Sequence, residues 1–343
     1  MSSSRRSISL PAAPAVVAGI GRAVMLTEDG ELLDLPVAEA AALLRESTPP
    51  MLVHAPASLR RLGLPPGPAL DLLELFAFVL PAQPVAPTPK GLAIALDMPP
   101  PARGSEAASL PDMAQALLGR LAALRGLPGA SRLAGLAARM GQGGWGWAPF
   151  VTAALGLPDA AASNDMLRVW KHLPEWEEAA PPPPPSSLPV SEAEARSRLA
   201  SILGSEAEQR PGQADYAAAA AAAFAPRELR GDPHMVLAEA GTGTGKTLGY
   251  VAPASLWAER NKGAVWISTF TRHLQRQVEA ELGRLHPDAA ERRRRVVVRK
   301  GRENYLCLLN LQESMGPALG HGAPSSLIPL GLLARWALRS ADG

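Results

Sequence analysis

The chain has 343 residues, of which 47% are hydrophobic, 19% charged and 4% aromatic, and this predicts a globular protein of about two domains. Its net charge of +2 is too small by itself to indicate nucleic-acid binding, and its single cysteine excludes an internal disulfide framework and fits a reducing compartment. No apolar stretch is long enough to span a bilayer, and prolines interrupt an N-terminus that weakly resembles an export signal, so we expect a cytoplasmic protein without a membrane contact.

The first half of the chain predicts a small α/β domain, which we assign to residues 1–180. Residues 15–35 predict strands around a turn at Asp29-Gly30, and residues 51–54 predict a further short strand. Helices are expected at residues 37–45, 70–80, 112–124 and 131–140. Strands that alternate with helices favour an α/β fold. Packing or interdomain anchoring, rather than base stacking, is the role expected for four tryptophans: Trp145, Trp147, Trp170 and Trp176.

Five consecutive prolines at residues 181–185 predict a stiff, extended segment, and we expect a linker over residues 181–190. In the second domain, residues 191–343, Ser191 and Glu194 have the spacing of a capping box at the start of a helix. Further helices are expected at 206–224, 271–285, 304–312 and 326–339, and strands at 234–239, 264–268 and 295–299. This order is typical of the first half of a parallel, doubly wound sheet domain.

The strongest functional motif is AEAGTGTGKT at residues 238–247, between a predicted strand and a predicted helix. Small residues let backbone N–H groups approach phosphate oxygens, and the N-terminus of the helix adds favourable partial charge. Lys246 is expected to reach the outer phosphates of a nucleotide and Thr247 to bind Mg²⁺. The residues expected to surround the phosphates are Ala240, Gly241, Thr242, Gly243, Thr244 and Gly245. The alternative is a glycine-rich turn that only opens a helix.

Four motifs follow one another along the second half: RPGQ at 210–213, the phosphate loop, ISTFT at 267–271 with Gln275, and KGRENYLC at 300–307. Together they resemble the DinG and XPD-like branch of superfamily two, the iron–sulfur ATP-dependent DNA helicases, over about residues 191–343. The resemblance implies an incomplete RecA-like P-loop motor domain that binds ATP and Mg²⁺. It also implies movement along single-stranded DNA, in DNA repair.

The resemblance assigns individual roles. Arg210 and Gln213 would read the adenine base. The surface that grips single-stranded DNA would include Ser268, Thr269, Thr271 and Gln275. The alternative is a polar helix start in which Thr271 or Ser268 is only a cap. The basic run at 291–302 is compatible with phosphate binding and also with an ordinary solvated face.

Cys307 would correspond to the first of four cysteine ligands of a [4Fe–4S] cluster. The chain has one cysteine, so we expect a cluster only in a full-length form, and a lone cysteine is more often a small apolar residue. No Asp-Glu pair follows Thr247, so the carboxylates that complete the Mg²⁺ site are missing. We therefore expect a helicase truncated before this motif, with a non-catalytic ATP- or DNA-binding protein as the alternative.

The first half resembles, more faintly, the proofreading-type exonuclease domain fused to some DinG relatives, through Val53-His54 and residues 70–75. That chemistry needs several carboxylates that converge on two metal ions. Leu59 and Ala107 stand where an aspartate and a histidine would be expected. The remaining acids, Asp71 and Asp112, cannot hold two metal ions by themselves. We expect a degenerate exonuclease-like scaffold or a partner-binding module.

Overall fold

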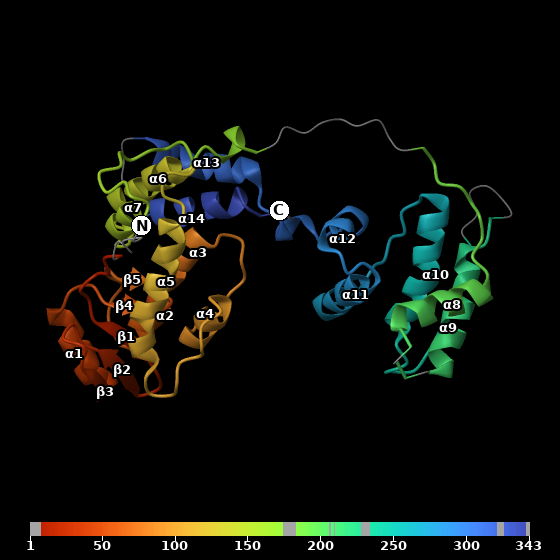
Figure 1. The fold of residues 1–343 in the computed structure, drawn as a ribbon, viewed down its shortest axis with the longest axis horizontal. Helices are drawn as coiled ribbons and strands as arrows, with labels where there is room; N and C mark the ends of the chain where they lie inside the picture. Colours follow the sequence, from red (N-terminus) through yellow and green to blue (C-terminus); the bar gives the residue numbers. More distant parts are fainter. Residues whose placement is uncertain are drawn as a thin grey trace, which may run out of the picture. The chain divides into compact units, whose positions relative to one another are not determined.

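The computed structural model describes residues 8–173, 183–205, 207–208, 210–227, 234–320 and 326–340. The chain forms two compact units (Figure 1). Unit 1 comprises residues 1–176 and 301–343, and unit 2 comprises residues 177–300. The boundaries expected from composition, at 1–180, 181–190 and 191–343, stay predictions, while the structure adds the last 43 residues, 301–343, to unit 1.

Unit 1 is built on a five-stranded mixed sheet with the strand order β3-β2-β1-β4-β5. Three strands form an antiparallel meander: β1 (Ala15–Ala18), β2 (Arg22–Leu26) and β3 (Leu32–Pro36). Two short parallel strands extend the sheet beyond β1: β4 (Met51–Leu52) and β5 (Leu70–Asp71). The predicted turn between β2 and β3 is confirmed, because Gly30 has a φ of 86° and its N–H donates to the Thr27 carbonyl. A left-handed φ of this kind favours glycine.

Helices pack against this sheet and against one another. They are α1 (Val37–Glu46), α2 (Ala55–Arg61), α3 (Leu72–Val79), α4 (Pro89–Ala95), α5 (Leu110–Ala122), α6 (Ala130–Gln142) and α7 (Ala148–Ala154). Trp145 and Trp147 are buried in the core, and the indole N–H of Trp147 donates to the Asp71 carbonyl at 2.8 Å. The packing role predicted for these two tryptophans is confirmed, and Trp176 lies outside the described residues.

The segment after residue 300 completes the core of unit 1. It contains α13 (Leu308–Leu319) and α14 (Leu327–Ala337), which begin and end at residues other than those predicted. Leu311, Met315 and Leu327 are buried in the same core as α3, α5 and α6. A Cβ on Gly331 of α14 would lie 2.5 Å from the Met140 sulfur on α6, so these two helices approach closely. Figure 1 shows the blue helices beside the yellow α6.

Unit 2 contains α8 (Glu192–Leu203), α9 (Pro211–Ala221), α10 (Lys246–Asn261), α11 (Arg272–Leu285) and α12 (Ala289–Arg295). The capping box that begins α8 is confirmed, since Ser191 and Glu194 cap each other's backbone N–H groups. Helix α9 begins later than predicted, at Pro211, a residue that favours the first position of a helix. The alanines of α9 bury their small side chains, so α8, α9 and α10 pack closely.

The three strands predicted for this half are not present among the described residues. Residues 234–239, 264–268 and 296–299 have no strand assignment, and Arg295 ends α12. A strand satisfies its backbone N–H and C=O groups only by pairing with a neighbour. Without that pairing, Trp266 and Phe270 remain 79% and 98% exposed. The described residues are mixed α/β, but the parallel sheet expected of a RecA-like domain is not formed in them.

Across all the residues that the structure describes, no helix combines the length and apolar character needed to cross a membrane.

Candidate functional site

The 241–245 loop leads into the N-terminus of α10. Gly243 and Gly245 have φ values of 80° and 76°, in the left-handed region where an L side chain is strained. Gly245 is also the N-cap of α10, and a Cβ there would lie 2.3 Å from Nε2 of Gln213. Both the conformation and the surrounding space at residue 245 therefore require glycine.

The first side chain of α10 folds across this loop. The ammonium group of Lys246 donates to the carbonyls of Ala240 and Gly241, each at 2.8 Å, and Thr244 Oγ1 donates to the Gly241 carbonyl at 2.9 Å. The N–H groups of Gly243 and Gly245 have no acceptor in the part of the chain that the structure describes. The loop thus combines one cation with free N–H donors at a helix N-terminus, an arrangement that suits an anion.

The structure brings two separate sequence motifs together at this loop. Gln213, near the start of α9, donates from Nε2 to the Gly245 carbonyl at 2.9 Å. Arg210 donates from Nη1 to the Gly243 carbonyl at 3.2 Å and forms an ion pair with Glu208 at 2.9 Å. The side chains to which the resemblance gives base recognition are therefore in direct contact with the predicted phosphate loop.

Thr247 is buried one residue into α10, and Tyr250 lies one turn later. Burial raises the pKa of the Tyr250 hydroxyl, while a hydrogen bond with Thr247 acts in the opposite direction. The sequence analysis missed Tyr250, although its spacing of three residues from Thr247 on a predicted helix could have indicated the contact.

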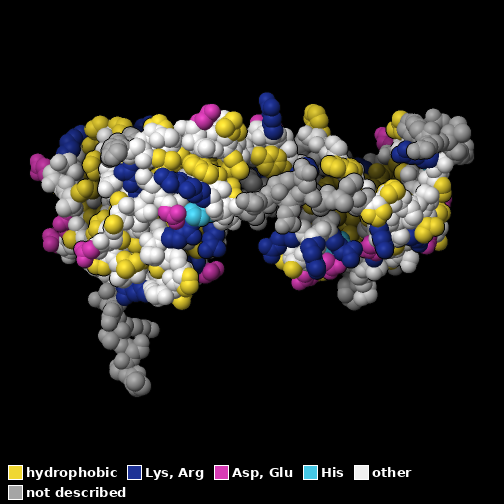
Figure 2. Space-filling view, turned by 90° about the horizontal axis from the view of Figure 1, so that it is seen from above, with side chains coloured by type: hydrophobic (Ala, Val, Ile, Leu, Met, Phe, Trp, Pro, Cys, Tyr) yellow, Lys and Arg dark blue, Asp and Glu magenta, His cyan; other side chains and the backbone are white. Residues whose placement is uncertain are grey.

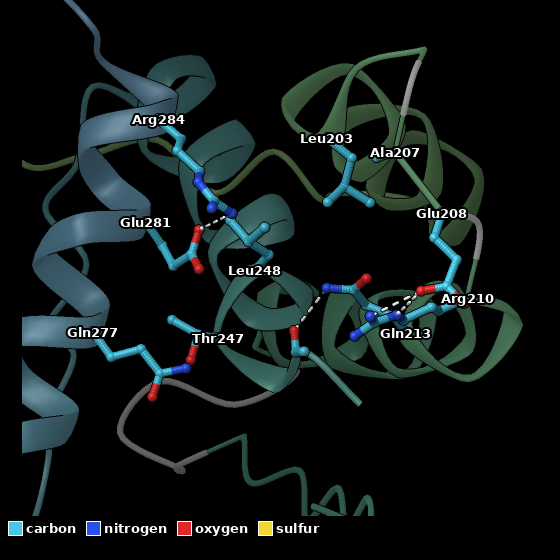
Figure 3. Close-up of a pocket in the computed structure, with 11 residues that line it drawn as sticks. Leu203, Ala207, Glu208, Arg210, Gln213, Thr247, Leu248, Gln277, Glu281 and Arg284 are labelled. Atoms are coloured by element: carbon cyan, nitrogen blue, oxygen red, sulfur yellow. Dashed lines mark hydrogen bonds and ion pairs between the residues drawn. The ribbon is translucent and has the colours of Figure 1, made fainter. Parts of the chain in front are cut away.

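A cavity of about 230 Å³ adjoins the loop (Figure 3). Its walls come from α8, α9, α10 and α11, and its lining residues are Leu203, Ala207, Glu208, Arg210, Gln213, Gly245, Thr247, Leu248, Gln277, Glu281 and Arg284. The last three, from α11, were missed by the sequence analysis. Their spacing of four and three residues puts them on one helix face, and Glu281 pairs with Arg284 at 3.0 Å. Figure 3 shows this α11 face across from Thr247 and Leu248.

The four residues assigned to single-stranded DNA lie outside this cavity. Ser268 and Thr269 are on the segment that leads to α11, and Gln275 is in the first turns of that helix. Thr271 is the N-cap of α11 and accepts from the Leu274 N–H at 3.2 Å, so its capping role is confirmed. Their part in DNA binding stays a prediction.

Cys307 is exposed at the N-cap position of α13, in unit 1. Within the described ranges, no group of three or more His, Cys, Asp or Glu side chains could hold a metal ion. A [4Fe–4S] cluster takes four thiolates, so one cysteine does not fit it.

The two acids of unit 1 considered for metal binding, Asp71 and Asp112, lie on different elements of the fold. The Asp71 carboxylate is buried and accepts from the N–H groups of His54, Ala55 and Leu73 at 2.6–2.9 Å, which joins β5 to the starts of α2 and α3. Asp112 is exposed in the first turn of α5. Leu59 and Ala107 are buried in the apolar core.

Glu74, on α3, was missed by the sequence analysis. Burial, together with the nearby Asp71 charge, raises the pKa of Glu74 to about 7. The nearby Trp145 indole opposes this rise, although its buried N–H has no hydrogen-bond partner within the described residues.

Comparisons with known proteins relate part of the chain to named helicases. No family model and no solved structure matches it. The ATP-dependent helicase DinG of Mycobacterium tuberculosis strain H37Rv is 42% identical over 111 residues, 31% of this chain and 16% of the relative. The ATP-dependent DNA helicase YoaA of Escherichia coli K12 is 40% identical over 114 residues, 33% of this chain and 17% of the relative.

A third relative, the 3'-5' exonuclease DinG of Bacillus subtilis strain 168, is 36% identical over 106 residues, 31% of this chain and 11% of the relative. The chain thus covers less than a fifth of the length of each of these relatives. These matches support a DinG-like assignment over about a third of the chain's residues.

Proposed function

We propose that the chain is the nucleotide-binding part of a cytoplasmic ATP-dependent DNA helicase, in which ATP hydrolysis would drive movement along single-stranded DNA. One observation carries the proposal. Gln213 and Arg210 donate hydrogen bonds to carbonyls of the 241–245 loop, beside a cavity of about 230 Å³. The names of the DinG and YoaA relatives support the same activity through the matched third of the chain.

In the proposed site, Lys246 would exchange its two carbonyl contacts for the outer phosphate oxygens of ATP. The ammonium group is charged in both cases, but the phosphate oxygens also carry negative charge, so the exchange adds an attraction between opposite charges. The free N–H groups of Gly243 and Gly245 and the N-terminus of α10 would hold further phosphate charge. The rest of the cradle is the backbone from Ala240 to Thr244.

Thr247 would supply its hydroxyl to Mg²⁺. This ion keeps several waters and binds few protein groups besides substrate phosphates, so a single hydroxyl beside a phosphate loop fits it. Bound Mg²⁺ would neutralise charge on the phosphates. The chain has no Asp-Glu pair after Thr247, so we expect it to bind Mg-ATP but to hydrolyse it very slowly.

Contact with single-stranded DNA would come from Ser268, Thr269, Thr271 and Gln275. Hydroxyl and amide groups commonly hydrogen-bond to phosphate oxygens without reading sequence. Ser268 and Thr271 are exposed, although the Thr271 hydroxyl already caps α11. No step of this proposal involves a [4Fe–4S] cluster, since Cys307 alone cannot hold one.

The alternative is a protein that binds ATP or DNA without catalysis, and the missing carboxylate pair favours it. A longer form of the protein separates the two. DNA-stimulated phosphate release by that form supports the helicase, and nucleotide binding without any turnover supports the alternative.

For unit 1 we propose a degenerate exonuclease-like scaffold or a partner-binding module. Its acids support the loss of two-metal chemistry, because the Asp71 carboxylate of β5 accepts from three backbone N–H groups, while Asp112 is exposed on α5. The mixed sheet β3-β2-β1-β4-β5 would then serve as a framework for packing and for contact with other proteins.

The nucleotide site is tested by titrating a fluorescent ATP analogue into the full chain with Mg²⁺. We expect saturable binding that Lys246→Ala weakens by at least tenfold, since a charge-assisted hydrogen bond contributes about 1.5–3 kcal/mol. Lys90→Ala, which removes an exposed lysine from α4 in unit 1, is the matched control and should bind like the wild type. Equal affinities for the wild type and Lys246→Ala would contradict the proposal.

A further inference from the structure

A buried positive charge lies in unit 1, far along the sequence from the phosphate loop. Arg335 of α14 is 6% exposed. Its Nε and Nη2 donate to the Phe78 carbonyl at 2.9 and 2.8 Å, and its Cζ lies 5.2 Å from the centre of the Phe78 ring. Neither contact supplies a negative charge, and no carboxylate among the described residues pairs with Arg335. A buried charge without a counterion is costly, so such groups are normally paired.

A cavity of about 280 Å³ adjoins this arginine. It is formed by the connection between α5 and α6, the start of α6, residues 166–172 and α14. Its walls are apolar where Leu133 and Met166 line it, and basic where Arg132, His172, Arg335 and Arg339 line it. On one face of unit 1, Figure 2 shows Lys and Arg side chains gathered around a histidine and an acidic side chain.

The charges around the cavity do not balance. Among the described residues, Asp165 is the acid that pairs with this lining: it lies 2.8 Å from Arg132 and 3.3 Å from His172. Arg339 is exposed in the turn that follows α14, four residues after Arg335, and, like Arg335, has no acidic partner in the described part of the chain. Burial, with a smaller contribution from Arg339, lowers the pKa of Arg335 to about 10, so the Arg335 guanidinium stays charged at neutral pH. Among the described residues, the positive charges of Arg335 and Arg339 therefore have no carboxylate partner.

We propose that this cavity binds a phosphate monoester, with the phosphate at Arg335 and Arg339 and the ester group against Leu133 and Met166. A phosphate monoester carries close to two negative charges at neutral pH, which matches the two unpaired arginines. The planar guanidinium donors fit phosphate oxygens. An apolar ester group would pack against the apolar wall, whereas inorganic phosphate has no apolar part to contact it. The phosphate belongs either to a free small molecule or to the 5' end of a nucleic-acid strand. This site is independent of the nucleotide site proposed for unit 2.

Calorimetric titration of phenyl phosphate into the full chain tests the proposal. The Lys246→Ala background weakens phosphate binding at the 241–245 loop by at least tenfold, which separates that loop from the cavity of unit 1. We expect one site per chain in this background, and weaker binding of inorganic phosphate, which leaves the apolar wall empty. Arg339→Ala should weaken phenyl phosphate binding by about tenfold, the effect of one charge-assisted hydrogen bond. Arg339 is exposed, so this variant keeps the core of unit 1 intact.

The matched control is Arg120→Ala, which removes an exposed arginine of α5 that does not line the cavity and should leave the affinity unchanged. Two oligonucleotides of equal sequence identify the source of the phosphate. Tighter binding of the 5'-phosphorylated strand supports a strand end, and binding of phenyl phosphate alone supports a free small molecule. Absence of phenyl phosphate binding, equal affinity for inorganic phosphate, or an unchanged affinity in Arg339→Ala each overturns the proposal.

Discussion

Gly245→Ala should weaken nucleotide binding by changing the geometry of the phosphate loop without changing its charge. The new Cβ meets two obstacles, because φ at residue 245 is 76° and the methyl group would lie 2.3 Å from Nε2 of Gln213. A left-handed conformation costs an alanine about 1 kcal/mol. Displacement of Gln213 also removes its hydrogen bond to the Gly245 carbonyl, which contributes about 1 kcal/mol. Together these effects give about 2 kcal/mol, or about a 30-fold loss of nucleotide affinity.

The assay is titration with a fluorescent ATP analogue, together with urea unfolding to check that the variant is folded. Gly212→Ala is the matched control, since a Cβ there meets no atom within 4 Å and φ is not in the left-handed region. We expect it to bind nucleotide within about twofold of the wild type, because alanine is a better helix former than glycine and nothing obstructs it. Wild-type affinity in a folded Gly245→Ala protein would refute the inferred link between the loop and Gln213.

Two further predictions concern unit 1. Glu74 has a folded-state pKa of about 7, above the 4.5 of the unfolded chain, so its ionisation destabilises the fold progressively as pH rises from about 4.5 to 7. Glu74→Gln should therefore increase the free energy of urea unfolding by up to about 2 kcal/mol at pH 8 and by little at pH 4.5. The figure for pH 8 allows for solvent screening at this partly exposed side chain. A gain of equal size at both pH values would show that ionisation is not the cause. Leu327→Ala should lower the unfolding free energy of unit 1 by about 3 kcal/mol, because Leu327 is fully buried on α14. Tryptophan fluorescence during urea unfolding measures this change. Leu308→Ala, at a residue 47% exposed, is its control, and equal effects of the two substitutions would argue against packing of α14 in this core.

Local sequence signals predicted the local structure well. The capping box at Ser191 and Glu194, the turn at Gly30 and the start of α10 after Gly245 each depend on a few neighbouring residues. Their conformations are set by side-chain to backbone hydrogen bonds or by a left-handed φ, so the sequence contains the necessary information.

Features that depend on distant partners could not be predicted in the same way. The segment 264–268 has an apolar strand-like composition, but a strand needs a paired neighbour, and none is present among the described residues. Helix α14 was expected near its observed position, yet nothing in its sequence indicates that its apolar face contacts α3 and α6 rather than unit 2. Likewise, the cavity face of α11 becomes visible only when that helix lies beside α10.

The contact between Arg335 and the Phe78 carbonyl joins residues 257 positions apart, and this has a consequence for synthesis on the ribosome. Helix α3 emerges early but lacks α14 until about 260 further residues have been translated, and α6 lacks it for about 195 residues. At usual elongation rates this interval is about 10–50 s. During that time the apolar faces of α3 and α6 that later receive α14 are exposed to solvent, to chaperones and to neighbouring nascent chains. The helices of unit 2 are completed earlier and make mainly local contacts, so we expect them to fold before the unit that precedes them in the sequence.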